Sequence, residues 1–126
     1  QQLADAPALL ELPTDHPRPA VQTFRGHTLP VTVPLELSQQ VKKLAQRQGV
    51  TLFMLLLAVF QLLLHRYSGQ SDILVGTPIA NRQRTELESL IGFFVNTLVL
   101  RAQMKESDTA ADLLDQVRQV ALDAYA

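Results

Sequence analysis

The sequence contains no cysteine and no tryptophan, and neither sign of charge predominates. Without cysteine there is no disulfide framework, thiol nucleophile or cysteine-based zinc site, and we expect a cytoplasmic protein. The 11 basic and 12 acidic residues give a formal net charge of −1, so the basic surface typical of nucleic-acid binders is missing. The histidines stand apart from one another in the sequence, and we therefore expect no metal site.

Several motifs of enzymes and membrane proteins are also absent. The few glycines are dispersed, so there is no glycine-rich phosphate loop, and no G-x-S-x-G nucleophile elbow occurs. The longest apolar run, residues 52–64, is interrupted by Gln61 and is shorter than the roughly 20 residues that cross a bilayer. We therefore expect a core helix that is buried on most sides rather than a membrane span.

Apolar residues make up 47% of the 126 residues, which is typical of a globular domain. The first 21 residues differ from the rest because Pro7, Pro13, Pro17 and Pro19 favour an extended path, so residues 1–21 are predicted to be a linker. The chain starts at Gln1 and ends inside a helical pattern, and we expect a piece of a longer polypeptide.

The remaining residues alternate between strand and helix patterns. Residues 28–35 predict a short edge strand, since Pro30 and Pro34 remove backbone donors. The further expected elements are a helix from Ser38 to Gly49, a helix from Thr51 to Tyr67, a buried strand over 73–80, a short helix over 86–90, a strand over 94–101 and a helix from Thr109. This order predicts an α/β (α+β) fold in which helices cover a mixed sheet.

The last predicted strand carries one amide in an otherwise apolar row. Phe94, Asn96, Leu98 and Leu100 share a face, so Asn96 is expected to be either a hydrogen-bonded core amide or a group that points into a cavity. Further polar residues lie near the strand ends, where ligands gather in open α/β sheets: Thr77, Asn81, Arg82, Thr97 and Arg101. From these residues alone no reaction can be assigned.

Four stretches, in order, resemble the condensation domains of nonribosomal peptide synthetases. They are residues 12–19 (LPTDHPRP), 49–54 with 65–70 (GVTLFM and HRYSGQ), 72–82 (DILVGTPIANR) and 90–101 (LIGFFVNTLVLR). The last is similar to the family motif I-G-x-F-V-N-T-x-x-x-R. The resemblance covers nearly the whole chain.

The resemblance implies a two-lobed fold similar to chloramphenicol acetyltransferase, with a substrate tunnel between the lobes. Residues 1–21 would be the inter-lobe linker and residues 22–126 part of the C-terminal lobe. Gly76, Thr77, Asn96 and Thr97 would line the tunnel, and Arg82 and Arg101 would anchor strand ends. The family joins a carrier-bound donor thioester to a carrier-bound acceptor amine, forming a peptide bond.

The family's catalytic motif, H-H-x-x-x-D-G, is absent because no two histidines are adjacent, so the fragment alone is expected to be inactive. The resemblance implies no directly bound cofactor, but phosphopantetheine arms on partner carrier domains. Other expected partners are the missing N-terminal lobe, an adjacent adenylation domain and further copies of the fragment. The alternatives are an epimerisation or cyclisation domain of the same superfamily, a non-catalytic carrier-docking module and, apart from the resemblance, an α/β interaction domain.

Overall fold

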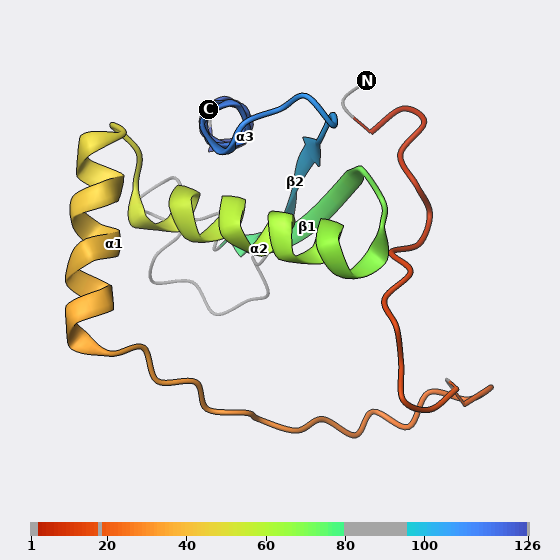
Figure 1. Ribbon diagram of the computed structural model, residues 1–126. Coiled ribbons are helices and arrows are strands. Elements are labelled where there is room, and N and C mark those ends of the chain that lie inside the picture. Colours follow the sequence, from red (N-terminus) through yellow and green to blue (C-terminus); the bar gives the residue numbers. More distant parts are fainter. Residues whose placement is uncertain (1–2, 18, 80–95, 126) are drawn as a thin grey trace, which may run out of the picture.

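The computed structural model describes residues 3–17, 19–79 and 96–125. Its elements are α1 (Leu35–Arg47), α2 (Leu52–Ser68), β1 (Asp72–Ile79), β2 (Asn96–Gln103) and α3 (Ala110–Tyr125). The predicted α/β class is confirmed: β1 and β2 form an antiparallel pair, with α2 and α3 packed against it (Figure 1).

The register of the strand pair decides which side chains share a face. Ile73 lies opposite Ala102 and Val75 lies opposite Leu100. Since side chains alternate between the faces of a strand, these four residues point to the same side of the sheet. Three of them, Ile73, Leu100 and Ala102, are at most 1% exposed, so this is the face that the helices cover.

The core is a layer of apolar side chains between the sheet and the two helices. The buried members on α2 and α3 recur at helical spacing: Met54, Leu55, Leu57 and Ala58, then Leu113, Leu114, Val117 and Ala121. α1 contributes only Ala45 to the buried set.

Both ends of the central helix are capped. The Thr51 side chain accepts a hydrogen bond from the Met54 backbone N–H at 3.1 Å, which satisfies one of the free donors at the start of α2. At the other end Gly69 has φ 72°, the left-handed conformation that glycine adopts without strain. Its N–H donates to the His65 carbonyl. Both ends of α2 are therefore specified locally.

The prediction of a strand over residues 28–35 is wrong. No strand forms there, and α1 begins at Leu35, three residues before Ser38. Pro34 precedes the helix, and the Ser38 hydroxyl donates back to the Pro34 carbonyl at 3.0 Å instead of capping. The two prolines limit strand pairing, and residues 28–34 pair with neither β1 nor β2.

The expectation that α2 is buried on most sides is also wrong for this chain, because only one face is covered. The opposite face carries an exposed apolar row, here called the α2 stripe: Phe53, Leu56, Phe60, Leu63 and Tyr67, which are 44% to 65% exposed. Their spacing alternates between three and four residues, as in a helix that packs along another helix. Within the part of the chain described here, nothing packs along this stripe.

Two further expectations are affected by the described range. The helix over 86–90, together with Arg82, Asn81 and Phe94, lies outside the described residues. Among the helices that are described, none is individually long and apolar enough for a membrane span, although α1 and α2 pass that length-and-composition test as a pair bent by 104°.

Candidate functional site

The residues proposed from the sequence to line a tunnel lie together at one end of the strand pair. Pro78 is opposite Thr97 and Ile79 is opposite Asn96, so Gly76 and Thr77 are within a few residues of both. The register divides them between two faces. Thr77 and Asn96 point to the side of the helices, whereas Gly76 and Thr97 point to the other side, here called the open face.

Gly76 and Thr97 are close neighbours across the strands. A Cβ atom added to Gly76 would lie 3.2 Å from the Thr97 Cγ2 atom, which is tighter than an ordinary contact. The close neighbour is therefore a side-chain methyl group of the paired strand. A side chain at residue 76 would have to displace the Thr97 methyl group. Glycine at this position therefore lets the Thr97 side chain lie close to the backbone of β1.

Asn96 is not the buried amide that the strand pattern suggested. Its residue is exposed, and its side-chain oxygen accepts a hydrogen bond from the Thr97 backbone N–H at 2.8 Å. This local bond, typical of asparagine, satisfies the side chain without a core partner. The other reading of the pattern, an amide that points into a cavity, stays a prediction.

The buried amide belongs instead to Gln61, which in the sequence only interrupts the apolar run of α2. Gln61 is 1% exposed, and its Nε2 donates to the Leu100 carbonyl of β2 at 3.0 Å. Its Oε1 has no hydrogen-bond partner among the described residues. A buried amide is usually fully hydrogen-bonded. The Gln61 Oε1 is therefore a buried acceptor that lacks a donor among the described residues. The interruption of the run was the only signal in the sequence.

Arg101 lies on the open face and forms a bidentate ion pair with Asp72 at the start of β1. Its Nε donates to Oδ1 at 2.9 Å and its Nη2 to Oδ2 at 2.6 Å. The hydrogen bond from Arg101 holds the pKa of the Asp72 carboxyl below its usual value. The same bond raises the pKa of the Arg101 guanidinium. Two fixed, parallel bonds of this kind define orientation as well as charge.

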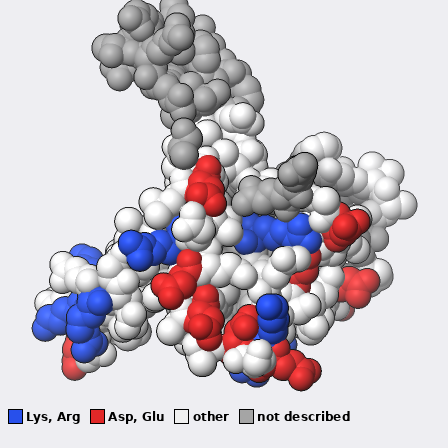
Figure 2. Space-filling model, turned by 90° about the horizontal axis from the view of Figure 1, so that it is seen from above, with Lys and Arg blue, Asp and Glu red and all other residues white. Residues whose placement is uncertain are grey.

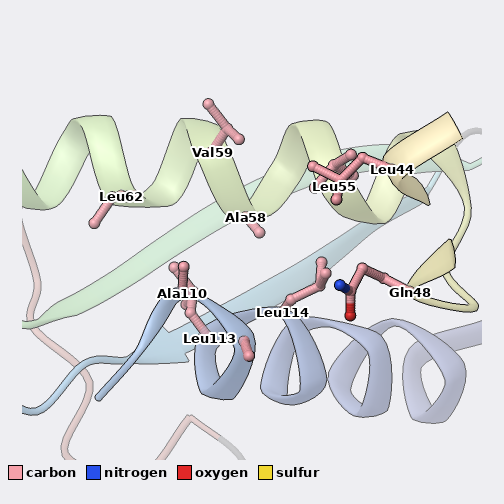
Figure 3. A pocket seen from close by; sticks show the side chains of 10 residues that line it. Leu44, Gln48, Leu55, Ala58, Val59, Leu62, Ala110, Leu113 and Leu114 are labelled. Carbon is pink, nitrogen blue, oxygen red and sulfur yellow. The ribbon is translucent and has the colours of Figure 1, made fainter. Parts of the chain in front are cut away.

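Two of the hollows in the described surface lie beside the strand pair and the helices. An apolar hollow of about 250 Å³ lies between the end of α1, α2 and α3, where Ala58 and Leu62 point from α2 toward α3, Leu114 points back toward α2 and Gln48 lies at one end (Figure 3). No titratable side chain from the described part of the chain lines it. On the open face a second hollow, of about 330 Å³, lies between residues 7–10 and β1 with β2.

Charged groups are likewise dispersed. Seen from above, basic and acidic side chains alternate with neutral surface (Figure 2). α1 carries the exposed basic residues Lys42, Lys43 and Arg47, as its pattern predicts. Within the described ranges no three His, Asp or Glu side chains come together as metal ligands. The described residues thus form a scaffold with polar strand ends rather than a catalytic cluster.

Comparison with known proteins identifies this scaffold. The sequence matches the Condensation domain family over residues 1–126, so the chain belongs to that family. It is 55% identical over 126 residues to a linear gramicidin synthase from Brevibacillus parabrevis, covering all of this chain and 2% of the relative. The chain therefore spans a small part of the length of such relatives.

Solved structures agree with this assignment. A four-domain nonribosomal peptide synthetase bound to AMP and glycine superposes with a TM-score of 0.89 at 32% identity, covering 95% of this chain and 9% of that one. The X-domain from teicoplanin biosynthesis shares the fold, with a TM-score of 0.84 over 92% of this chain and 26% of that domain, at 23% identity. The predicted family and the condensation-domain fold are thus confirmed.

Proposed function

We propose that this chain is part of the C-terminal lobe of a condensation domain that forms peptide bonds in a nonribosomal peptide synthetase. The observation that carries this proposal is the family match over residues 1–126 together with the synthetase relatives. In the proposed reaction the amine nitrogen of the acceptor attacks the thioester carbonyl of the donor. The C–N bond forms, the C–S bond breaks, and the amine proton leaves as the thiol is released.

The proposed contribution of this chain is scaffolding, because its sequence lacks the paired-histidine motif of the family. Gly76, Thr77, Asn96 and Thr97 would shape the tunnel along which the substrates approach one another. Their place at one end of the strand pair, and the exposure of Asn96, support this role. The catalytic groups would come from a preceding N-terminal lobe.

The strand-end anchors are Arg82 and Arg101 in this proposal. The bidentate pair of Arg101 with Asp72 supports its part, since it fixes the start of β1 against β2. Arg82 lies outside the described residues and remains a prediction from the sequence.

The proposed partners follow from the synthetase assignment. Two carrier domains would present the donor and the acceptor on phosphopantetheine arms, and an adenylation domain would be adjacent in the same cytoplasmic polypeptide. Residues 1–21 would link the lobes, and residues 22–126 would belong to the second lobe. The α2 stripe supports packing against the remaining part of the domain, or self-association of the isolated fragment, because exposed apolar rows of this size rarely stay uncovered.

The test of the proposed function uses the whole condensation domain of the parent protein with its two neighbouring carrier domains. Each carrier is loaded through an aminoacyl coenzyme A conjugate, and the intact mass of the acceptor carrier is followed. We expect an increase equal to the mass of the donor acyl group. An acceptor mass that stays constant across a panel of loaded amino acids, with both carriers verified as loaded, would contradict the proposal.

A further inference from the structure

The open face of the sheet is partly covered by the N-terminal segment, residues 3–12. This segment has no helix or strand, yet Ala6, Pro7 and Leu10 are half-buried against the face. It runs along the side of the molecule opposite to α1, past the end of α2 (Figure 1). Its own backbone makes two hydrogen bonds, from the Ala6 N–H to the Leu3 carbonyl and from the Leu12 N–H to the Leu10 carbonyl. Its other backbone groups need partners outside the segment if the segment is to hold a fixed course.

Gln70 supplies two of these bonds through its side-chain amide. Its Nε2 donates to the Leu9 carbonyl at 3.0 Å, and its Oε1 accepts from the Glu11 backbone N–H at 2.8 Å. A carbonyl and an N–H two residues apart on one side of an extended chain are the groups that a neighbouring strand would bind. The Gln70 amide therefore takes the place of a strand at this point of the segment.

The backbone of Gln70 is itself held in place by the end of α2. Its N–H donates to the Ser68 hydroxyl at 3.1 Å, and its carbonyl lies 2.7 Å from the His65 Nδ1. Because a carbonyl only accepts, Nδ1 must carry the proton in this contact. Gly69, in the left-handed conformation, turns the chain so that Gln70 follows directly. The amide is thus presented from a rigid helix end.

A separate bond secures the beginning of the segment. The Arg101 Nη1 donates to the Ala4 carbonyl at 3.0 Å while Nε and Nη2 hold Asp72. The segment is therefore fixed at both ends, over a distance of several residues, to the strand pair and to the end of α2. Between the two anchors lies the hollow of about 330 Å³ on the open face.

We propose that Gln70 is a positioning residue that latches residues 3–12 to this lobe and so fixes the orientation of the preceding part of the polypeptide. The proposal rests on the proposed function in one respect, the assignment of residues 1–21 as the link to an N-terminal lobe. The latch would hold the two lobes at the separation at which the donor and acceptor arms meet. Its loss would leave each lobe folded while the link between them moves.

The experiment compares the whole parent condensation domain with its Gln70→Leu variant by amide hydrogen exchange. Loss of the two hydrogen bonds is expected to speed exchange in residues 3–12 by about tenfold or more, with the Glu11 amide most affected. The melting temperature is expected to stay close to that of the wild type. Peptide-bond formation is expected to slow with the carrier KM unchanged, because the carrier-binding surfaces remain intact.

Gln116→Leu is the matched control. The Gln116 amide makes the same pair of bonds inside the lobe, accepting from the Gln103 N–H at 2.8 Å and donating to its carbonyl at 3.1 Å. Its loss should speed exchange at Gln103 and leave residues 3–12 and the turnover unchanged. If the leucine variant does not fold, Gln70→Glu, of the same size, takes its place. Its carboxylate still accepts from the Glu11 N–H but repels the Leu9 carbonyl, so amide exchange in residues 3–12 should become faster.

Unchanged exchange in residues 3–12 in a folded Gln70 variant would overturn the latch. Faster exchange with unchanged turnover would overturn its role in positioning the lobes. A wild-type domain without any turnover would contradict the proposed function instead, and the exchange measurement would still decide whether Gln70 holds the segment.

Discussion

The buried amide of Gln61 allows a prediction whose sign is opposite to the usual expectation for a core hydrogen bond. Gln61 is 1% exposed, donates to the Leu100 carbonyl at 3.0 Å and has an Oε1 without a described partner. Gln61→Leu removes one hydrogen bond, at a cost of about 1 kcal/mol. It also removes a buried unpaired oxygen, whose desolvation costs about 1 to 3 kcal/mol. We therefore expect a free energy of unfolding that is unchanged or raised by up to about 2 kcal/mol.

The assay is urea unfolding of the parent condensation domain, with the slope of the transition compared between variants. Gln61→Glu is the contrasting variant, because a carboxylate would face the Leu100 carbonyl in a buried place. Burial raises the pKa of such an acid, so the folded state binds more protons than the unfolded state. The variant should be destabilised by several kcal/mol at pH 7 and should regain stability as the pH falls toward about 4.3, the usual value for Glu.

A Gln61→Leu variant that loses more than about 2 kcal/mol would refute the reasoning. That result would mean that Oε1 has a partner in the intact domain, so that the substitution breaks two bonds and leaves a polar group unpaired. Gln61→Glu with stability independent of pH would contradict the burial of the side chain.

Three further predictions concern the caps and the open face in the same parent domain. Thr51→Ala should lower the free energy of unfolding by about 1 kcal/mol in urea unfolding, as expected for loss of an N-cap, whereas Thr51→Ser should not. The Asp72 carboxyl has a lowered pKa in the folded state, so its pairing with Arg101 stabilises the fold above about pH 4, and this stabilisation is lost as the pH falls below that value. The free energy of unfolding of Asp72→Asn should therefore depend less on pH in the acid range. An unaltered pH dependence would contradict the pairing. Gly76→Val should destabilise by about 1 to 3 kcal/mol through contact with the Thr97 methyl group, and Thr97→Ser in the double mutant should restore part of the loss; strict additivity would contradict the contact.

Local chemistry made the ends of α2 predictable from the sequence. Thr51 at the start and Gly69 at the end carry their own structural preference, in the one case a hydroxyl acceptor and in the other a left-handed φ. Neither depends on distant residues. The family resemblance rested on four short sequence motifs, and the family is confirmed over residues 1–126.

Burial was harder to predict, because it depends on what packs against each face. The all-apolar pattern of α2 indicated burial on most sides, yet Phe60 and Leu63 are exposed in this chain. The pattern shows how apolar each face of α2 is, but not which segment packs against that face. A continuous apolar run predicted β1 and alternation predicted β2. Residues 28–34 alternate as well, but they pair with neither strand, because alternation does not decide which segments pair.

The location of the buried amide was hard to predict for a related reason. A strand pattern shows that Asn96 shares a face with Leu98 and Leu100, but not how far along the strand the helices reach. The helices cover Leu100 and leave Asn96 exposed. Gln61 becomes the buried amide because it lies on the covered face of α2, directly over β2.

The central claim is that this chain belongs to a working peptide-bond-forming domain, and transfer between loaded carriers tests it most directly. In the whole parent domain, the acceptor carrier should gain the mass of the donor acyl group, and the product should remain thioester-linked to the acceptor arm. Loss of the donor acyl group to water alone, with no gain on a verified loaded acceptor, would contradict the account.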